Sequence, residues 1–120
     1  MNQNAFDEYV ISLRRKFHQH PELSGKEKDT RAVICAELEK LGIPYDIVDA
    51  KNVIGCIKNG SGKRIAFRAD IDALPVEEQV DVPWKSNTPG VMHACGHDAH
   101  TAALLGAAKL FAETPSQWHG

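Results

Sequence analysis

Long apolar runs, an excess of basic residues and a secretory leader pattern are all missing from this 120-residue chain. No stretch approaches the roughly 18 apolar residues of a membrane-spanning helix. The first residues, MNQNAFDEYV, have neither the basic start nor the apolar run of a signal peptide. The formal net charge is only -2, so no strong positive field attracts nucleic acid or anionic lipid. We therefore expect a soluble protein that binds neither nucleic acid nor a membrane.

Cysteine is also scarce. Cys35, Cys56 and Cys95 are odd in number and far apart, which is poor material for a disulfide framework. Reduced thiols are typical of intracellular proteins, so we expect a cytoplasmic location. Cys35 and Cys56 are interpreted as small buried core residues.

Composition and apolar spacing predict a small mixed fold. Hydrophobic residues make up 42% and charged residues 25%, which is ordinary for one globular domain. Phe6, Val10, Leu13 and Phe17 draw one apolar stripe on a helix over residues 4–18. A second helix should follow Ser24, which with Glu27 fits a capping box.

Three strand candidates come next, over residues 45–48, 52–57 and 64–69, with a hairpin turn signal at residues 59–62. A third helix begins near residue 101, and its many small residues predict close packing against a sheet. The order helix, helix, three strands, loop, helix indicates an α/β or α+β fold. Between the last strand and this helix, residues 70–92 form a long connection with three prolines. Loops of that length are usually functional or disordered.

That loop ends in the stretch MHACGHDAH, which holds half of the six histidines of the chain. His93, Cys95 and His97 alternate and could share one face of an extended segment. His97 and His100 would share a face of a helix. A metal site is the favoured interpretation. The alternatives are a Cys95 nucleophile with a histidine base, or histidines without a shared function.

Three acidic residues bear on this choice. Asp98 lies where the third helix should start, so it is a candidate N-cap or a hydrogen-bond partner of a ligand histidine. Asp70 and Asp72 end the third strand candidate and could bind a metal or orient a histidine, or form a solvated turn before Pro75. His18 and His20, near the end of the first helix, are interpreted as capping residues.

Three motifs, LRRKFHQHPELS, RADIDALPVEE and MHACGHDAHTAALLGAAKL, resemble the N-terminal part of the M20 metallopeptidase superfamily. The resemblance is strongest to its amidohydrolase branch, which includes N-acyl-amino-acid, hippurate and auxin-conjugate hydrolases. It implies part of a three-layer αβα catalytic domain with two divalent metals, commonly manganese, zinc or cobalt. Cys95 and His97 match metal ligands, and Asp70 and Asp72 match positions near the metals. Supporting or orienting roles are implied for His93, Asp98 and His100.

The resemblance also implies residues beyond position 120: a general-base glutamate beside a glutamate ligand, further histidine ligands, and a lid domain that often mediates dimerisation. Glu77 and Glu78 are adjacent but lie in the wrong motif. We therefore expect residues 1–120 to be the N-terminal fragment of a catalytic domain. The parent activity would be hydrolysis of N-acyl amino acids or related small amides.

The isolated chain should then be inactive, with no catalytic residue of its own, and should self-associate through uncovered apolar surface. The alternatives are a non-catalytic remnant, half of a split protein that binds a partner chain, or a cysteine hydrolase that uses Cys95.

Overall fold

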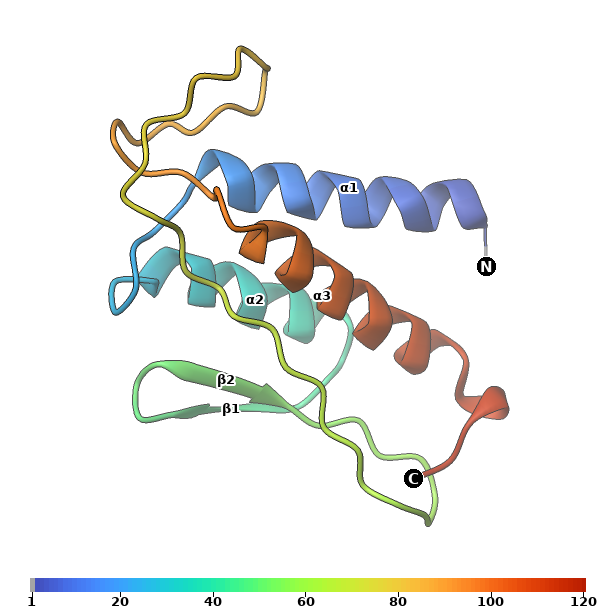
Figure 1. Cartoon of the computed structure of the whole chain (residues 1–120). Coiled ribbons are helices and arrows are strands. Elements are labelled where there is room, and N and C mark those ends of the chain that lie inside the picture. The colour runs from blue at the N-terminus through green and yellow to red at the C-terminus, as the bar shows by residue number, and fades with distance from the viewer. Residues whose placement is uncertain (1) are drawn as a thin grey trace.

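The computed structural model describes residues 2–120 of the chain. Helices α1, α2 and α3 lie on one side of a two-stranded antiparallel hairpin (Figure 1). The elements in order are α1 (Gln3–Gln19), α2 (Lys28–Lys40), β1 (Tyr45–Val48), β2 (Asn52–Gly55), α3 (His97–Glu113) and a short 3₁₀ helix, η1 (Pro115–Gln117). No helix among residues 2–120 is long and apolar enough to cross a bilayer.

Helix α1 confirms the helix expected over residues 4–18. Its N-cap is Asn2, whose side chain accepts the backbone N–H of Asn4 at 3.0 Å. Such a bond satisfies one of the donors that a helix start leaves unpaired. The helix ends before Pro21, because the residue that precedes a proline avoids the helical region.

The start of α2 differs from the predicted capping box. The helix begins at Lys28, and Ser24 makes no cap. Glu22 takes this place from the turn after α1: its carboxylate accepts the N–H of Thr30 at 2.5 Å and the N–H of Asp29 at 3.1 Å. A carboxylate at a helix N-terminus also complements the helix dipole, so this acceptor outcompetes a neutral hydroxyl.

The sheet has two strands, and the predicted third strand is wrong. β1 and β2 pair directly, with Asp49 and Ala50 of the turn between them in the left-handed region. Residues 64–69 make no backbone hydrogen bond within the described chain. Ile65 and Phe67 of this segment are 73% and 64% exposed. A strand forms only where another strand supplies its hydrogen bonds, and nothing in residues 2–120 does so here. Asn59, expected in a hairpin turn, pairs instead with Gly120.

Small residues of α3 meet a helix rather than a sheet. Gly106 faces α1, where an added Cβ would lie 2.7 Å from Cγ2 of Val10. The absence of a side chain at Gly106 therefore sets how closely α1 and α3 approach. The expectation that this helix packs closely on a sheet is corrected to close packing on α1.

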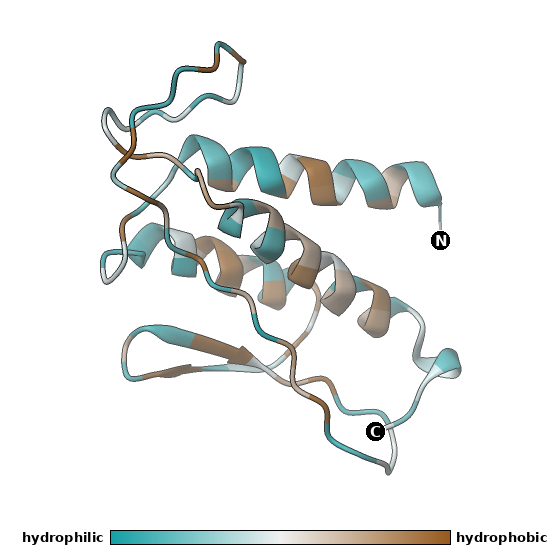
Figure 2. Ribbon diagram, viewed as in Figure 1, coloured by the Kyte–Doolittle hydropathy of each residue, from teal (hydrophilic) through white to brown (hydrophobic). Residues whose placement is uncertain are grey.

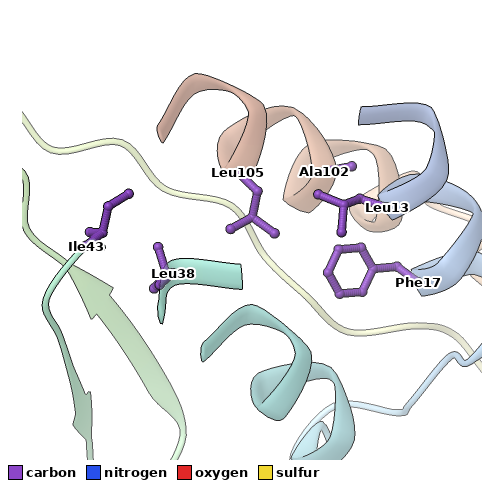
Figure 3. Packing of buried hydrophobic residues seen from close by; sticks show 6 residues of the cluster. All are labelled: Leu13, Phe17, Leu38, Ile43, Ala102 and Leu105. Atoms are coloured by element: carbon purple, nitrogen blue, oxygen red, sulfur yellow. The ribbon is translucent and has the colours of Figure 1, made fainter. Parts of the chain in front are cut away.

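The core lies between the three helices and the chain that leads into β1 (Figure 3). Its buried members are Leu13, Phe17, Leu38, Ile43, Ala102 and Leu105. Burying one large apolar side chain contributes about 1.5–3 kcal/mol, so these contacts hold α1 and α3 together. Figure 2 shows hydrophobic residues along α3 and also on β2, where Ile54 is exposed. Of the two cysteines expected in the core, Cys35 is buried, but Cys56 is exposed just after β2.

Candidate metal centre

Backbone hydrogen bonds bring the two metal-associated motifs together at the base of the long loop. The N–H of Leu74 donates to the carbonyl of Met92 at 2.9 Å, and the N–H of Met92 donates to the carbonyl of Leu74 at 3.0 Å. The N–H of Ala73 donates to the carbonyl of Glu22 at 2.8 Å. The segment that contains Asp70 and Asp72 therefore lies beside the segment that leads into α3.

His97, the first residue of α3, contacts Asp72 directly. Its Nδ1 lies 2.9 Å from Oδ1 of Asp72 and 3.0 Å from the Asp72 carbonyl oxygen. Both side chains are partly buried. When Nδ1 donates to a carboxylate, the lone pair is left on Nε2, the arrangement found for many metal-binding histidines. This pair thus brings the two motifs into direct contact.

Cys95 lies at the surface, just before α3 begins. Gly96 between Cys95 and His97 is the helix N-cap, with φ of 97°. Side-chain-bearing residues are strained in this left-handed region, so glycine permits the sharp entry into the helix. Cys95 and His97 therefore flank the start of α3, as the sequence indicates.

Asp70 and Asp72 contact different side chains. Its Oδ1 accepts two hydrogen bonds from Arg68, at 2.7 and 3.1 Å, and its side chain is 48% exposed. These bonds and the guanidinium charge hold the pKa of Asp70 below its ordinary value. Of the two aspartates, only Asp72 hydrogen-bonds His97.

The expectation that Asp98 is the N-cap is wrong, because the helix begins at His97, with Gly96 as its cap. Asp98 is 1% exposed and turns toward α1. Its Oδ2 lies 2.7 Å from Nδ1 of His18 and 3.0 Å from Nε of Arg14. Both partners of this carboxylate are side chains of α1.

The other two histidines of the cluster differ from each other. His93 is 5% exposed, and neither of its ring nitrogens has a hydrogen-bond partner within the described residues. Burial lowers the pKa of His93, with partial opposition from Asp98, so the neutral ring is favoured. His100 is exposed, and its ring centroid lies 5.8 Å from that of His97.

His18 and Glu78 are buried participants that the sequence interpretation did not assign to the site. Nε2 of His18 lies 2.6 Å from Oε1 of Glu78. His20, by contrast, is exposed and contacts the carbonyl of Lys16 at 3.0 Å, a capping contact of the kind expected. A signal for His18 was present, because Arg14 and His18 share a helix face beside the apolar stripe.

The side chains present fit part of a metal centre. His97 keeps Nε2 for a ligand, and Cys95 supplies a sulfur next to it in the chain. Imidazole and thiolate suit zinc and related divalent ions. Among residues 2–120, however, no three His, Cys, Asp or Glu side chains are placed to hold one ion.

Comparison with known proteins agrees with the motifs. Residues 66–120 match the family described as peptidase family M20/M25/M40. The chain is 44% identical over 119 residues to IAA-amino acid hydrolase ILR1-like 4 of Arabidopsis thaliana, covering 98% of this chain and 27% of the relative. It is 50% identical over 107 residues to thermostable carboxypeptidase 2 of Saccharolobus solfataricus, covering 87% of this chain and 27% of that protein.

A solved structure shows the same relationship. The Bacillus subtilis YxeP protein, described as a dinuclear metal binding peptidase from the M20 family, superposes with a TM-score of 0.93 at 44% identity. The match covers 98% of this chain and 34% of YxeP. The 120 residues thus span about a quarter to a third of the proteins that they match. In sequence and in fold, the chain matches the N-terminal portion of longer members of the M20 peptidase family.

Proposed function

We propose that this chain supplies Cys95 and His97 to the divalent-metal centre of an amidohydrolase. The observation that carries the proposal is the bond between His97 and Asp72, which leaves Nε2 of His97 for a metal. The similarity to a dinuclear metal binding peptidase supports a second ion in the complete site. Manganese, zinc and cobalt are the proposed ions.

The proposed substrate class is an N-acyl amino acid or a related small amide. One relative is named a hydrolase of IAA-amino acids and another a carboxypeptidase. Both names describe cleavage of a bond to an amino acid. When bound, the metal supplies Lewis-acid activation of water and of the amide carbonyl.

The residues of this chain hold and orient the site in this proposal. Asp72 fixes the ring of His97 by accepting the Nδ1 proton. Asp70, whose carboxylate is already bound by Arg68, keeps a supporting role at the rim. His93 and His100 border the site without a ligand role. The general base, which typically contributes about 10²- to 10⁴-fold, is proposed to come from residues other than these 120.

The 120-residue chain by itself is therefore proposed to be inactive. Two ligands give far weaker binding than the four of a closed zinc site. The loss of a base together with several ligands removes a catalytic unit, so the effects are not simply additive.

A second candidate is a half-protein that pairs with another chain. The unpaired segment 64–69, with Ile65 and Phe67 exposed, favours it. A cysteine hydrolase that uses Cys95 is a third candidate, because the contact with Asp72 that leaves Nε2 of His97 for a metal would equally suit a histidine base. For location, the three free cysteines support the reducing cytoplasm.

The test compares two samples against N-acetyl- and N-benzoyl-amino acids with manganese, zinc or cobalt. One is the chain alone, and the other is the chain co-expressed with the remaining portion of a related enzyme. We expect metal-dependent turnover only in the second sample, with loss in His97→Ala and persistence in His20→Ala. Activity that resists a chelator and is lost only in Cys95→Ser would favour the cysteine hydrolase instead.

A further inference from the structure

His18 forms the centre of a buried ionic cluster outside the proposed ligand set. It lies in the last turn of α1 and is 4% exposed. Its Nδ1 lies 2.7 Å from Oδ2 of Asp98, and its Nε2 lies 2.6 Å from Oε1 of Glu78. One imidazole ring therefore bridges two buried carboxylates.

Each carboxylate contact of His18 is satisfied when the ring nitrogen carries a proton that the carboxylate oxygen accepts. Arg14 lies beside the same ring: its Nη2 is 3.4 Å from Nδ1 of His18, and its Nε is 3.0 Å from Oδ2 of Asp98. The cluster therefore combines two buried carboxylates with an imidazole and a guanidinium.

Glu78 is ionised in this cluster. Burial alone would raise the pKa of its carboxyl, but the N–H of Ser86, at 2.6 Å, and the ring of His18 together hold the pKa below its ordinary value. No described group other than Arg14 adds positive charge in direct contact with His18.

The cluster joins the two ends of the loop that carries the site. Glu78 lies near the start of the loop, shortly after Asp72, and Asp98 lies beyond its end, next to His97. Figure 1 shows the loop and the orange start of α3 beside the C-terminal end of α1, where His18 is placed. A single side chain of α1 thus fixes both segments that hold candidate site residues.

We propose that His18 is a positioning residue, whose ring, in contact with both Asp98 and Glu78, holds the loop and the first turn of α3 so that Cys95 and His97 keep their arrangement. This role rests on the proposed function only in its consequence for metal binding. The clamp itself can be measured without metal or substrate.

The first measurement is the proton and nitrogen-15 spectrum of the histidine rings in the 120-residue chain. We expect a ring N–H proton of His18 that exchanges slowly with solvent, because both ring nitrogens face buried carboxylates. Exposed His20 serves as the internal comparison and should exchange rapidly. Rapid exchange at His18 would overturn the proposal, and this result needs no variant that has to fold.

The second measurement compares His18→Gln with His20→Gln by amide hydrogen exchange. Two amides report on the clamp: Ser86, which donates to Glu78, and His100, which donates to the carbonyl of Gly96 at 3.1 Å. We expect both to exchange at least about 10-fold faster in His18→Gln, with little change at Leu105 in the middle of α3. Equal loss of protection along α3, or the same change in His20→Gln, would reduce His18 to a general stability role and overturn the proposal.

A cobalt titration then separates this inference from the proposed function. Loss of a residue that orients ligands typically costs about 10- to 100-fold in metal affinity. We expect that loss in His18→Gln and not in His20→Gln. If the parent chain binds no cobalt while the exchange result holds, the clamp stands and the metal function fails. Unchanged cobalt affinity in His18→Gln would contradict the positioning role.

Discussion

The ring of His97 lies 2.9 Å from the carboxylate of Asp72, although 25 residues separate them in the chain. The backbone pair between Leu74 and Met92 closes the loop between them and makes this contact possible. We expect Asp72→Asn to lower cobalt affinity about 10-fold, because the amide orients the ring without a charge.

Asp70→Asn is the matched control, since Arg68 already holds that exposed carboxylate. The cobalt affinity of Asp70→Asn should stay within about 3-fold of that of the parent chain. This change is much smaller than the one expected when a residue that orients a metal ligand is lost. Equal losses in the two variants, measured by the same titration, would mean that Asp72 has no special relation to His97.

The approach of α1 and α3 supplies a prediction about stability. Gly106→Ala places a methyl group against Val10 and should cost about 1–3 kcal/mol in the free energy of unfolding. Val10→Ala makes room for this methyl group, so the double variant should recover a large part of the loss. Urea denaturation of the four proteins in the cycle measures the coupling. Simple additivity would show that the two residues do not meet.

The pH dependence of stability should report on Glu78. Its pKa is lower in the folded chain than its ordinary value, so its stabilising contribution is present above about pH 4.3. The contribution is lost as the pH falls through the folded value. Glu78→Gln should destabilise the chain by about 3 kcal/mol at pH 7, because it leaves His18 with one carboxylate.

The difference between Glu78→Gln and the parent chain should shrink as the pH falls from 5 toward 3. Glu8→Gln, an exposed change on α1, serves as the control. Urea midpoints across this range provide the measurement. A difference that stays constant with pH would contradict the lowered pKa.

The exposed segment 64–69 predicts self-association. An unpaired extended backbone flanked by apolar side chains is a template for pairing with a second chain. Ile65→Lys should shift the chain toward monomer in sedimentation velocity, and Ile11→Lys, at another exposed apolar position on α1, should not. If the parent chain stays monomeric at high protein concentration, this surface is not an interface.

Local patterns in the sequence predicted the local structure well. The stripe from Phe6 to Phe17 predicted α1 because helix periodicity needs no distant partner. The third strand failed for the opposite reason: the pattern at Ile65 and Phe67 is that of a strand, but the hydrogen bonds must come from another segment. The α/β composition was therefore predicted, and the sheet size was not.

The site shows the same division. The clustering of Cys95 and His97 was visible in the sequence because the two residues are neighbours, and their ligand roles stay a prediction. The contact between Asp98 and His18 was not predicted. The helix begins at His97, which turns the Asp98 carboxylate toward His18, 80 residues away in the chain. No spacing rule connects His18 with Glu78 and Asp98, so only the fold reveals the cluster.

A cobalt titration of the chain, followed by visible absorption, tests the central claim most directly. We predict weak binding of one ion, with a thiolate absorption band that disappears in Cys95→Ser. His97→Ala should weaken the binding further, and affinity should fall as the pH drops, because metal ligands must be deprotonated. Tight, stoichiometric binding of two ions that is unaffected by Cys95→Ser and His97→Ala would contradict the assignment of these residues to a shared metal centre.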